Sequence, residues 1–517
     1  MNHGGSETSQ LVPGVTYRDL VDAAMRHRTE ASFRRSDFFR THGAALERLL
    51  LTPRVETPTD DGNGEGSGNV GDPAGRTDRV DRGDRVDRTA LVDQAGPAPR
   101  RNRSDGAAGV EPGDESLPGA ASLRVLQWNI EKGRELEGII RRLHDDPWMC
   151  RAGLLLLNEV DRGTARGGND DQARRLAAAL GMHHAWLPTY IECTKGTGVD
   201  LAAEGENTLG LHGLAILSRW PIMAARAVTL PPCHDYFNFH EKRWGGRRGL
   251  YTLIAAGDRP FVAATTHLEV RRTPRCRALQ FAAFLRGLDE SLGVWTREGL
   301  LDRGLSGRLR NEERGERNEE RGKRKEERGT RKEERGERNE EEGVSDEESK
   351  VAAGVAASGV PVILGGDWNT NTFRRGTLAR SAVEFLRLVT TPAETLAAQL
   401  VAPFSREPLF DLLAAEGFAV APCNGAVPTV AQDLGSIEDL AAIPASLARG
   451  VDRAFGLSGR VLRMRLDWIA IRDLQVCGRP VTLSAIGSDG RALSDHAAIG
   501  IDTAGRTAPR RPRTFRP

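Results

Sequence analysis

The stretch "PVILGGDWNTN", residues 361–371, combines an apolar run with polar groups at its end. Residues 362–364 lead into two glycines and then Asp367, Trp368 and Asn369, which predicts a buried strand of an α/β sheet. In an extended chain, Asp367 and Asn369 point to one side and Trp368 points to the other. Open α/β sheets bind ligands beyond the carboxyl ends of their strands, where this pair is expected. Taken alone, however, the stretch favours an Asx-type turn.

Five other predicted strands carry polar residues at or near their ends. These stretches are "LRVLQWNIEKG" (123–133), "AGLLLLNEVD" (152–161), "FVAATTHLEV" (261–270), "RLDWIAI" (465–471) and "LSDHAAIGI" (493–501). Each alone has an ordinary explanation, such as a helix cap, an ion pair or a buried histidine. Together they supply carboxylate and amide oxygens, which suit Mg²⁺ or Mn²⁺, and histidines, which suit proton transfer. This set predicts metal-assisted hydrolysis of a phosphate ester.

The distribution of apolar residues predicts one large folded body in the chain of 517 residues. We expect an N-terminal helical segment at 1–51, a disordered linker at 52–121, the folded body at 122–503 and a basic, disordered tail at 504–517. The helical periodicity of the first segment places Leu20, Ala24, Met25, Leu46, Leu49 and Leu50 on apolar stripes that would dock on the core.

An Arg/Glu-rich insertion at 301–350 interrupts the folded body. It contains five tandem heptads such as "RNEERGE", each with one glycine and without the apolar positions of a coiled coil. Because such a composition cannot offset the entropy of ordering, we expect a disordered insertion.

Charge and cysteine content exclude several classes of protein. The net charge of +1 gives no indication of a polyanionic partner. The six cysteines lack C-x-x-C spacing, so neither a zinc knuckle nor a disulfide framework is predicted. The N-terminus lacks the pattern of a signal peptide, and no apolar run is long enough for a membrane span, so we expect a cytoplasmic protein.

The motifs W-N-I-E, N-E-V-D, T-H-L-E, G-D-W-N, L-D-W-I and S-D-H occur in this order between residues 128 and 496. In their residues and their order these motifs resemble those of the endonuclease/exonuclease/phosphatase superfamily, which has the DNase I-like fold. The resemblance spans about 122–503 and implies an α/β (α+β) fold. Its architecture would be a four-layer α/β/β/α sandwich of two packed mixed β-sheets, with the active site at one edge.

The resemblance also implies a metal site and a phosphate site. Glu159 matches the main metal-ligating glutamate, and Glu131 and Asp495 would complete or support a site for Mg²⁺ or Mn²⁺. Asn129 would bind a phosphate oxygen or help to hold the metal, and Asn369 would steady the phosphate or the intermediate.

Four further residues match the family's proton-transfer groups. Asp367 would orient or deprotonate the attacking water, and Asp467 would hold the ring of His496. The resemblance leaves open whether His496 accepts the water's proton or stabilises the phosphate. His267 matches a histidine near the leaving oxygen in the DNase-like and sphingomyelinase-like branches.

The branch of the superfamily is less sharply indicated. N-E-V-D and G-D-W-N-T-N depart from the Q-E-T-K and G-D-L-N-V-A of AP endonucleases, whereas "NEVDRGTARGG" resembles the bacterial Q-E-V-D-R group of metal-dependent hydrolases. Arg162 and Arg166 follow the metal motif and could clamp a substrate phosphate, or could pair with Asp170 or Asp171. The loop "EKRWGGRRG", 241–249, is either a second substrate contact or a glycine-rich hairpin.

Three functions are therefore compared. The sequence favours an Mg²⁺-dependent phosphodiesterase or phosphatase that acts on a small or lipid-linked phosphoester. The first alternative is a nuclease that uses the same site on DNA or RNA, although the near-neutral charge counts against duplex binding. The second is a non-catalytic binding module, although each catalytic position of the family holds a competent residue. No obligate protein partner is indicated.

Overall fold

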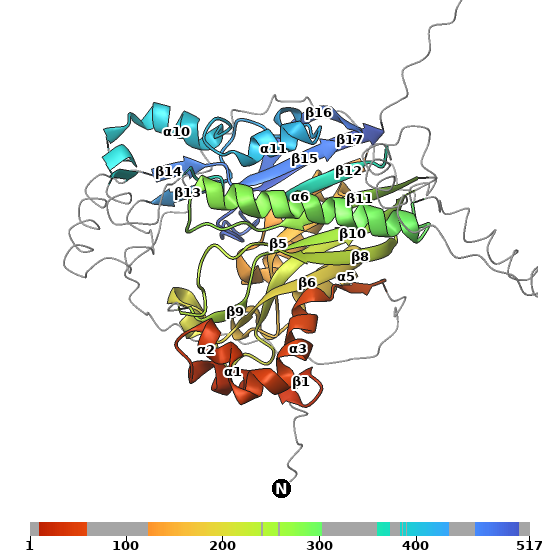
Figure 1. Cartoon of the computed structure of the whole chain (residues 1–517). Coiled ribbons are helices and arrows are strands. Elements are labelled where there is room, and N and C mark those ends of the chain that lie inside the picture. Colours follow the sequence, from red (N-terminus) through yellow and green to blue (C-terminus); the bar gives the residue numbers. More distant parts are fainter. Residues whose placement is uncertain are drawn as a thin grey trace, which may run out of the picture.

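A computed structural model describes most of the chain outside the linker, the insertion and the tail (Figure 1). The described residues are 10–58, 123–238, 241–256, 259–301, 359–372, 383–384, 386–388, 390–433 and 461–505. The predicted disorder of the linker, the insertion and the tail concerns residues that lie almost entirely outside these ranges.

The larger of the two main sheets has eight strands. Its order is β16 (Leu474–Leu483), β17 (Ala498–Gly505), β4 (Leu123–Asn129), β5 (Leu154–Arg162), β7 (Leu211–Ser218), β6 (His183–Glu192) and β3 (Arg54–Glu56), with β9 (Arg243–Gly245) also paired to β6. Strands β4 and β5 are parallel, whereas the other pairs are antiparallel. The predicted strands at 123–133 and 152–161 thus lie side by side.

The smaller main sheet has five strands. Its order is β15 (Asp467–Arg472), β12 (Val362–Asp367), β11 (Arg259–Thr266), β10 (Arg248–Ala256) and β8 (Ile222–Thr229). Strands β11 and β12 are parallel and the remaining pairs are antiparallel. Both sheets are therefore mixed, as predicted.

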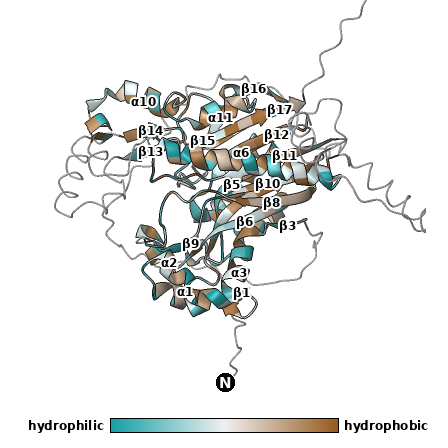
Figure 2. Ribbon diagram, viewed as in Figure 1, coloured by the Kyte–Doolittle hydropathy of each residue, from teal (hydrophilic) through white to brown (hydrophobic). Residues whose placement is uncertain are grey.

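Alternating side chains of the strands fill the space between the two sheets and the space outside them. In β5, Leu154 and Leu156 face the inter-sheet core, together with Ile363 of β12, whereas Leu155 and Leu157 face the outer core of the large sheet. Figure 2 shows mainly hydrophobic strands such as β12 and β15 and helices of alternating colour, as expected for helices with one buried face.

Helices cover the outer faces and complete the four predicted layers. Buried residues of α3 (Asp37–Leu51), α4 (Leu136–Asp145) and α5 (Gln172–Leu180) pack on the large sheet. Those of α6 (Pro274–Arg297) and α11 (Leu409–Ala415) pack on the small sheet. The α/β/β/α sandwich of the DNase I-like fold is thereby confirmed. No helix in the described part of the chain has the length and apolarity that crossing a bilayer requires.

Seven further α-helices and strands of the described residues lie outside the two main sheets and the helices named above. They are β1 (Gln10–Val12), β2 (Val15–Thr16), α1 (Tyr17–Met25), α2 (Glu30–Arg34), α10 (Ala393–Val401), β13 (Val430–Asp433) and β14 (Val461–Met464). The predicted docking of the N-terminal helices is confirmed for Leu20, Ala24, Leu46 and Leu50, which are buried in the outer core of the large sheet. Met25 was wrongly assigned to this buried stripe, because it ends α1 and is 55% exposed.

Two predicted domain boundaries shift by a few residues. The linker was predicted to begin at residue 52, but Arg54–Glu56 form β3, the edge strand that pairs with β6. The folded body was predicted to end at 503, but β17 continues to Gly505. Both strands gain backbone hydrogen bonds from a neighbour in the sheet, which local composition does not reveal.

Candidate active site

A cavity of about 460 Å³ lies at the edge of the sandwich where the polar ends of the strands meet. Seven of the residues predicted from the motifs line it, namely Glu131, Glu159, His267, Asp367, Asn369, Asp495 and His496. Asn129 and Asp467 lie beneath this lining and are hydrogen bonded to it. The structure therefore brings together the motifs of strands that are far apart in the chain.

The register of the sheets explains this convergence. Asn129 ends β4 opposite Asn158 of β5, and Asp367 ends β12 opposite Asp467 of β15. The amide oxygen of Asn158 accepts a hydrogen bond of 2.7 Å from the backbone N–H of Asp367, and so joins the two sheets. Asn158 is thus a structural link beneath the site, a role that the motifs did not indicate.

Three residues of the cavity have left-handed backbone conformations. The φ angles are 48° for Glu131, 58° for Glu159 and 51° for Asn369. Glu159 is also the extra residue of a β-bulge, because the register of β5 against β7 shifts between Asn158 and Val160. The backbone therefore turns at each strand end and directs these side chains into the cavity.

The glycines before Asp367 allow a close approach of two strands. Gly366 has a φ of 148°, and a Cβ atom there would lie 2.0 Å from the carbonyl oxygen of Thr266 in β11. Trp368 is fully buried and its ring lies 4.9 Å from that of Phe281 in α6. The strand end is therefore held in the core while Asp367 faces the cavity, as predicted.

Asp367 lies at the centre of the polar contacts. Its Oδ1 accepts a hydrogen bond from the backbone N–H of Asn369 at 3.0 Å, and its Oδ2 accepts one from Nδ2 of Asn129 at 3.2 Å. Nε2 of His267 lies 3.3 Å and Nε2 of His496 lies 3.8 Å from the same Oδ2. Burial raises the pKa of Asp367 to about 7, which is suitable for proton transfer near neutral pH.

The two histidines have opposite electrostatic surroundings. Burial lowers the pKa of His496, but the carboxylates of Asp467, Asp495 and Asp367 outweigh it and hold this pKa well above its usual value. Nδ1 of His496 lies 2.7 Å from Oδ2 of Asp467, as predicted. Burial, and next Arg247, lower the pKa of His267 well below its usual value. The surroundings of His496 therefore favour its cationic form, whereas those of His267 favour the neutral imidazole.

The predicted metal ligands line one side of the cavity. Burial raises the pKa of Glu159, but the electrostatic influence of His212, Lys132 and His496 brings it below its usual value, which favours the carboxylate. Glu131 accepts a hydrogen bond of 2.9 Å from the backbone N–H of Asp495 and forms an ion pair with Arg134. The Asp495 side chain is exposed at the rim.

A tighter acidic group lies beside this side of the cavity. Among the described residues, the group of His, Cys, Asp and Glu side chains with ligand atoms all within 4.8 Å of one another is Asp367, Asp467 and His496. However, both oxygens of Asp467 already accept hydrogen bonds, from Gln127 and His496. We therefore interpret this group as a proton-transfer unit and Glu159, a hard anionic oxygen donor, as the residue suited to Mg²⁺.

The structure contradicts the assignment of Arg162 and Arg166 to substrate binding. Nε of Arg162 lies 2.9 Å from Oδ2 of Asp171, the alternative that the sequence had left open. Arg166 has a 2% exposed side chain and forms an ion pair of 2.7 Å with Asp161 beneath the site. Neither arginine lines the cavity, because alternation along β5 and the turn after it direct both away.

Other basic and aromatic residues line the cavity instead. They are Lys132, His212, Tyr236, Arg243, Arg247 and Arg271. Arg243 and Arg247 belong to the 241–249 loop, which therefore lines the cavity, while its predicted contact with substrate stays a prediction. His212 has no motif in the sequence, and it faces the cavity because it pairs across β7 and β5 with Asp161, 2.7 Å away.

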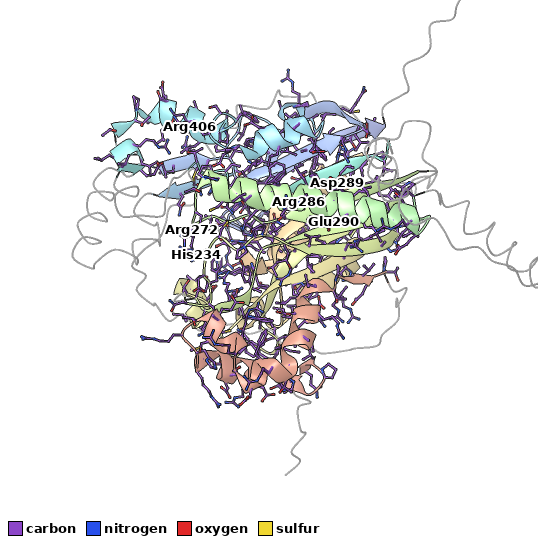
Figure 3. The ribbon with its side chains drawn as sticks, in the orientation of Figure 1. His234, Arg272, Arg286, Asp289, Glu290 and Arg406 are labelled. Atoms are coloured by element: carbon purple, nitrogen blue, oxygen red, sulfur yellow. The ribbon has the colours of Figure 1, made fainter. Side chains whose placement is uncertain are left out.

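This arrangement places a buried aspartate with a raised pKa, a histidine paired with a second aspartate, and a glutamate carboxylate around one cavity. Charged residues elsewhere, such as Arg286, Asp289 and Glu290, are exposed along α6 and point to solvent (Figure 3). Such an arrangement could accept a proton from water at Asp367 and stabilise an adjacent anionic centre through His496, and Glu159 is the residue that would hold a metal ion there.

Comparisons with known proteins agree with the motifs. The model of the Endonuclease/Exonuclease/phosphatase family matches residues 126–496, which include every residue that the motifs assigned to the catalytic and metal site. No curated protein matches the sequence significantly.

Solved structures with a similar chain have low sequence identity. The catalytic domain of human Nocturnin is 15% identical, with a TM-score of 0.35, and 74% of this chain and 94% of that chain are covered. An endonuclease/exonuclease/phosphatase from Beutenbergia cavernae is 16% identical, with a TM-score of 0.35 and coverage of 74% and 72%. A mannosyl-6-phosphatase from Bacteroides thetaiotaomicron is 11% identical, with a TM-score of 0.34 and coverage of 74% and 99%.

Proposed function

The chain belongs to the endonuclease/exonuclease/phosphatase family and is thus a phosphoester hydrolase, and we propose that it acts on a small or lipid-linked phosphoester with the help of Mg²⁺. The observation that carries this proposal is the Asp467–His496 pair beside Asp367 and across from Glu159 in one cavity.

Asp367 would accept the proton of the attacking water. Its pKa of about 7 allows the carboxylate to be populated at neutral pH and to bind the proton strongly enough. The contacts from Asn129 and Asn369 hold its two oxygens in a fixed direction. The water would approach from the cavity side, where Asp367 is accessible.

His496 would stabilise negative charge on the phosphate. Because its pKa is well above the usual value after the opposing effect of burial, it enters the reaction as a cation and is a poor proton acceptor. Asp467 fixes its ring through Nδ1 and leaves Nε2 to donate toward the cavity. This choice between the two roles of His496 is supported by the charges around it.

Glu159 would hold the metal ion, with Glu131 and Asp495 near it. Glu159 fits this task because it is an anionic oxygen donor that reaches the cavity and keeps its charge despite burial. When bound, Mg²⁺ would stabilise negative charge on the phosphate oxygens. Asn129 donates to Glu159 at 3.2 Å as well as to Asp367, and so would set the spacing of the two carboxylates.

A steady-state assay with bis-p-nitrophenyl phosphate and p-nitrophenyl phosphate tests the proposal. Hydrolysis should require Mg²⁺ or Mn²⁺, stop in EDTA and return when the metal is restored. Asp467→Asn should lower kcat by roughly 100-fold or more, because the ring of His496 loses its fixed orientation and part of its charge. Metal-independent hydrolysis by the wild-type protein, or a fully active Asp467→Asn variant, would exclude this mechanism.

A nuclease is the second candidate. The cations Arg243, Arg247 and Arg271 at the cavity favour a substrate with more than one negative charge. They are confined to the cavity lining, however, whereas duplex binding uses basic residues spread over a surface. Adding a single-stranded and a double-stranded oligonucleotide to the same assay separates the candidates, since a nuclease would cleave one of them faster than either nitrophenyl ester.

A further inference from the structure

The N-terminal segment, residues 10–58, lies outside the region that matches the family. It forms α1, α2, α3 and the edge strand β3, and it packs beside β9 at the end of the large sheet (Figure 1). Its contacts converge on the chain segment that supplies the basic residues of the cavity. This convergence indicates a role in the site in addition to covering the sheet.

Tyr236, Arg243 and Arg247 form the basic wall of the cavity, as we name these three residues. Nη2 of Arg247 donates to the hydroxyl of Tyr236 at 3.2 Å, and the guanidinium of Arg243 lies 5.3 Å from the Tyr236 ring centre. The wall is thus one connected unit.

Arg247 is the member of the wall that is suited to bind an anion. It is 8% exposed, its Nε has no hydrogen-bond partner, and no carboxylate among the described residues lies within ion-pair distance of it. Arg243, in contrast, forms ion pairs with Glu192 and Glu241. Arg247 is linked to the carboxylate of Glu269 only through the hydroxyl of Tyr236, which donates to Glu269 at 3.0 Å. The guanidinium at the cavity therefore has no direct ion pair among the described residues and is suited to bind an anionic ligand.

Alternation along the chain places the N-terminal segment directly behind this wall. Arg243 and Trp244 are adjacent in β9 and therefore point to opposite sides. Arg243 lines the cavity, whereas Trp244 is 1% exposed and belongs to the core that the N-terminal helices share. Tyr236 and Phe237 divide in the same way, since Phe237 is buried in that core.

Phe33 of α2 connects the N-terminal segment to Phe237 and Trp244, the core residues that follow Tyr236 and Arg243 in the sequence. It is fully buried, and its ring stacks on Phe237 with centres 5.3 Å apart and meets Trp244 at 6.2 Å with the planes at 73°. Phe39 of α3 adds an edge contact of 5.6 Å to Trp244. These aromatic contacts fix the two residues whose neighbours in sequence form the wall.

Polar contacts repeat the connection at two other points. Nζ of Lys242 donates to the carbonyl oxygen of His27 at 2.5 Å and lies 3.9 Å from the centre of the Phe237 ring. The hydroxyl of Tyr17 donates to the carbonyl oxygen of Glu192 at 2.7 Å, and the Glu192 side chain lies 3.4 Å from Arg243.

We propose that the N-terminal segment is a specificity element that holds the basic wall in place through Phe33, so that Arg247 binds an anionic group of the substrate. Phe33 is a positioning residue, since it touches neither the cavity nor the catalytic groups. This inference rests on the proposed function only in that the anion belongs to a substrate; the binding of an anion by the wall can be measured without hydrolysis.

The test compares full-length variants with inorganic phosphate as the probe. Calorimetry in EDTA gives the Kd for phosphate without metal or turnover, and the nitrophenyl ester assay gives kcat and KM. Arg247→Gln should weaken phosphate binding by about 10-fold to 100-fold, the scale of a charged hydrogen bond. Phe33→Ala should weaken binding and raise KM by about 5-fold or more, with kcat within about 2-fold, because the wall loses its support.

Two further variants separate positioning from general stability. Leu50→Ala removes a buried side chain of the same segment at the far end of α3, and should lower the melting temperature while leaving the Kd for phosphate unchanged. Phe33→Leu should keep more of the affinity than Phe33→Ala, because it fills more of the buried volume although it lacks the ring contacts. If Phe33→Ala fails to fold, Tyr17→Phe takes its place in the test. This milder change removes one hydrogen bond between the segment and Glu192, and it should raise KM slightly.

The outcomes distinguish this inference from the proposed function. A wild-type protein that binds no phosphate in EDTA would overturn the inference, whatever its activity. Equal losses of phosphate affinity in Phe33→Ala and Leu50→Ala would also overturn it, since the segment would then act only through stability. Normal phosphate binding by the wall together with absent hydrolysis would reject the proposed function and leave the anion site standing.

Discussion

Replacing Asp367 by Asn is expected to abolish proton transfer while keeping the fold. The substitution preserves the volume of the side chain, and Oδ1 can still accept the hydrogen bond from the backbone N–H of Asn369. The new amide group would face Nδ2 of Asn129, which donates to Oδ2 of the wild-type carboxylate. That lost contact destabilises the fold, whereas removing a buried carboxylate that is near Asp467 and Glu159 stabilises it.

The expected fall in kcat is roughly 100-fold to 10,000-fold, the scale of lost general-base assistance. The two opposing effects on the fold should leave the melting temperature within about 3 °C of the wild type. The difference should also depend on pH in EDTA. Since burial raises the folded-state pKa of Asp367 from 3.8 to about 7, wild-type stability from this group is lost as pH rises through that interval. Asp367→Asn has no titrating group at this position, so its stability relative to that of the wild type should increase as the pH rises.

Trp368→Ala is the matched control at the next position. This side chain is fully buried against Phe281 and contacts no substrate, so its removal should lower the free energy of unfolding by about 3–5 kcal/mol. kcat per folded molecule should change much less than in Asp367→Asn. The measurements are kcat/KM with bis-p-nitrophenyl phosphate and thermal melting of both variants. An Asp367→Asn protein that unfolds but keeps normal activity per folded molecule would refute the catalytic role.

Three further predictions concern the metal and the charges around the site. Glu159→Gln should raise the Mg²⁺ concentration needed for half-maximal activity at least about 10-fold, because an anionic ligand is lost; an unchanged metal titration would contradict this. In urea melts, Arg166→Ala should destabilise the fold by about 3–5 kcal/mol by removing the buried cation that pairs with the carboxylates of Asp161 and Glu192, whereas Arg162→Ala should cost about 1 kcal/mol or less. Burial raises the pKa of Glu241, but neighbouring cations outweigh it and lower this pKa to about 2. The stability that the ionised Glu241 contributes should therefore be present above pH 4.5 and decline below it. Glu241→Gln should not show this decline.

The strands and layers could be predicted because their signals are local. Apolar runs such as Leu154–Leu157 mark strands, and the order of the motifs indicated a family whose fold is a sandwich of two mixed sheets. The short edge strand β3 escaped prediction, since three residues, of which two are exposed and one is half-buried, carry almost no periodic signal. Met25 was misplaced because the buried stripe of α1 runs through Leu20 and Ala24, and the next residue along a helix points about 100° away from that stripe.

The site was predictable where one residue type has one chemical task. Asp367, His496 and Asp467 lie together as the motifs implied. Arg162 and Arg166 do not line the cavity as the motifs implied. An arginine near a metal motif can bind substrate or can pair with a carboxylate of the protein, and only the packing decides between these two roles. The basic wall could not be assigned from sequence for a related reason, since which side chain of a β-strand faces the cavity depends on a register that one sequence does not state.

The left-handed backbone at Glu131, Glu159 and Asn369 has a consequence for the history of such a chain. A non-glycine residue in this conformation carries a strain of about 1–3 kcal/mol, which glycine would remove. As long as selection maintains catalysis, the three side chains are kept although glycine would make the fold more stable. In a lineage that has abandoned hydrolysis, mutation to glycine would be favoured at these positions before the surrounding core changes. A non-catalytic descendant of this protein would therefore be recognised by glycines at these three positions in an otherwise unchanged sandwich. It would also have a higher melting temperature than its active ancestor.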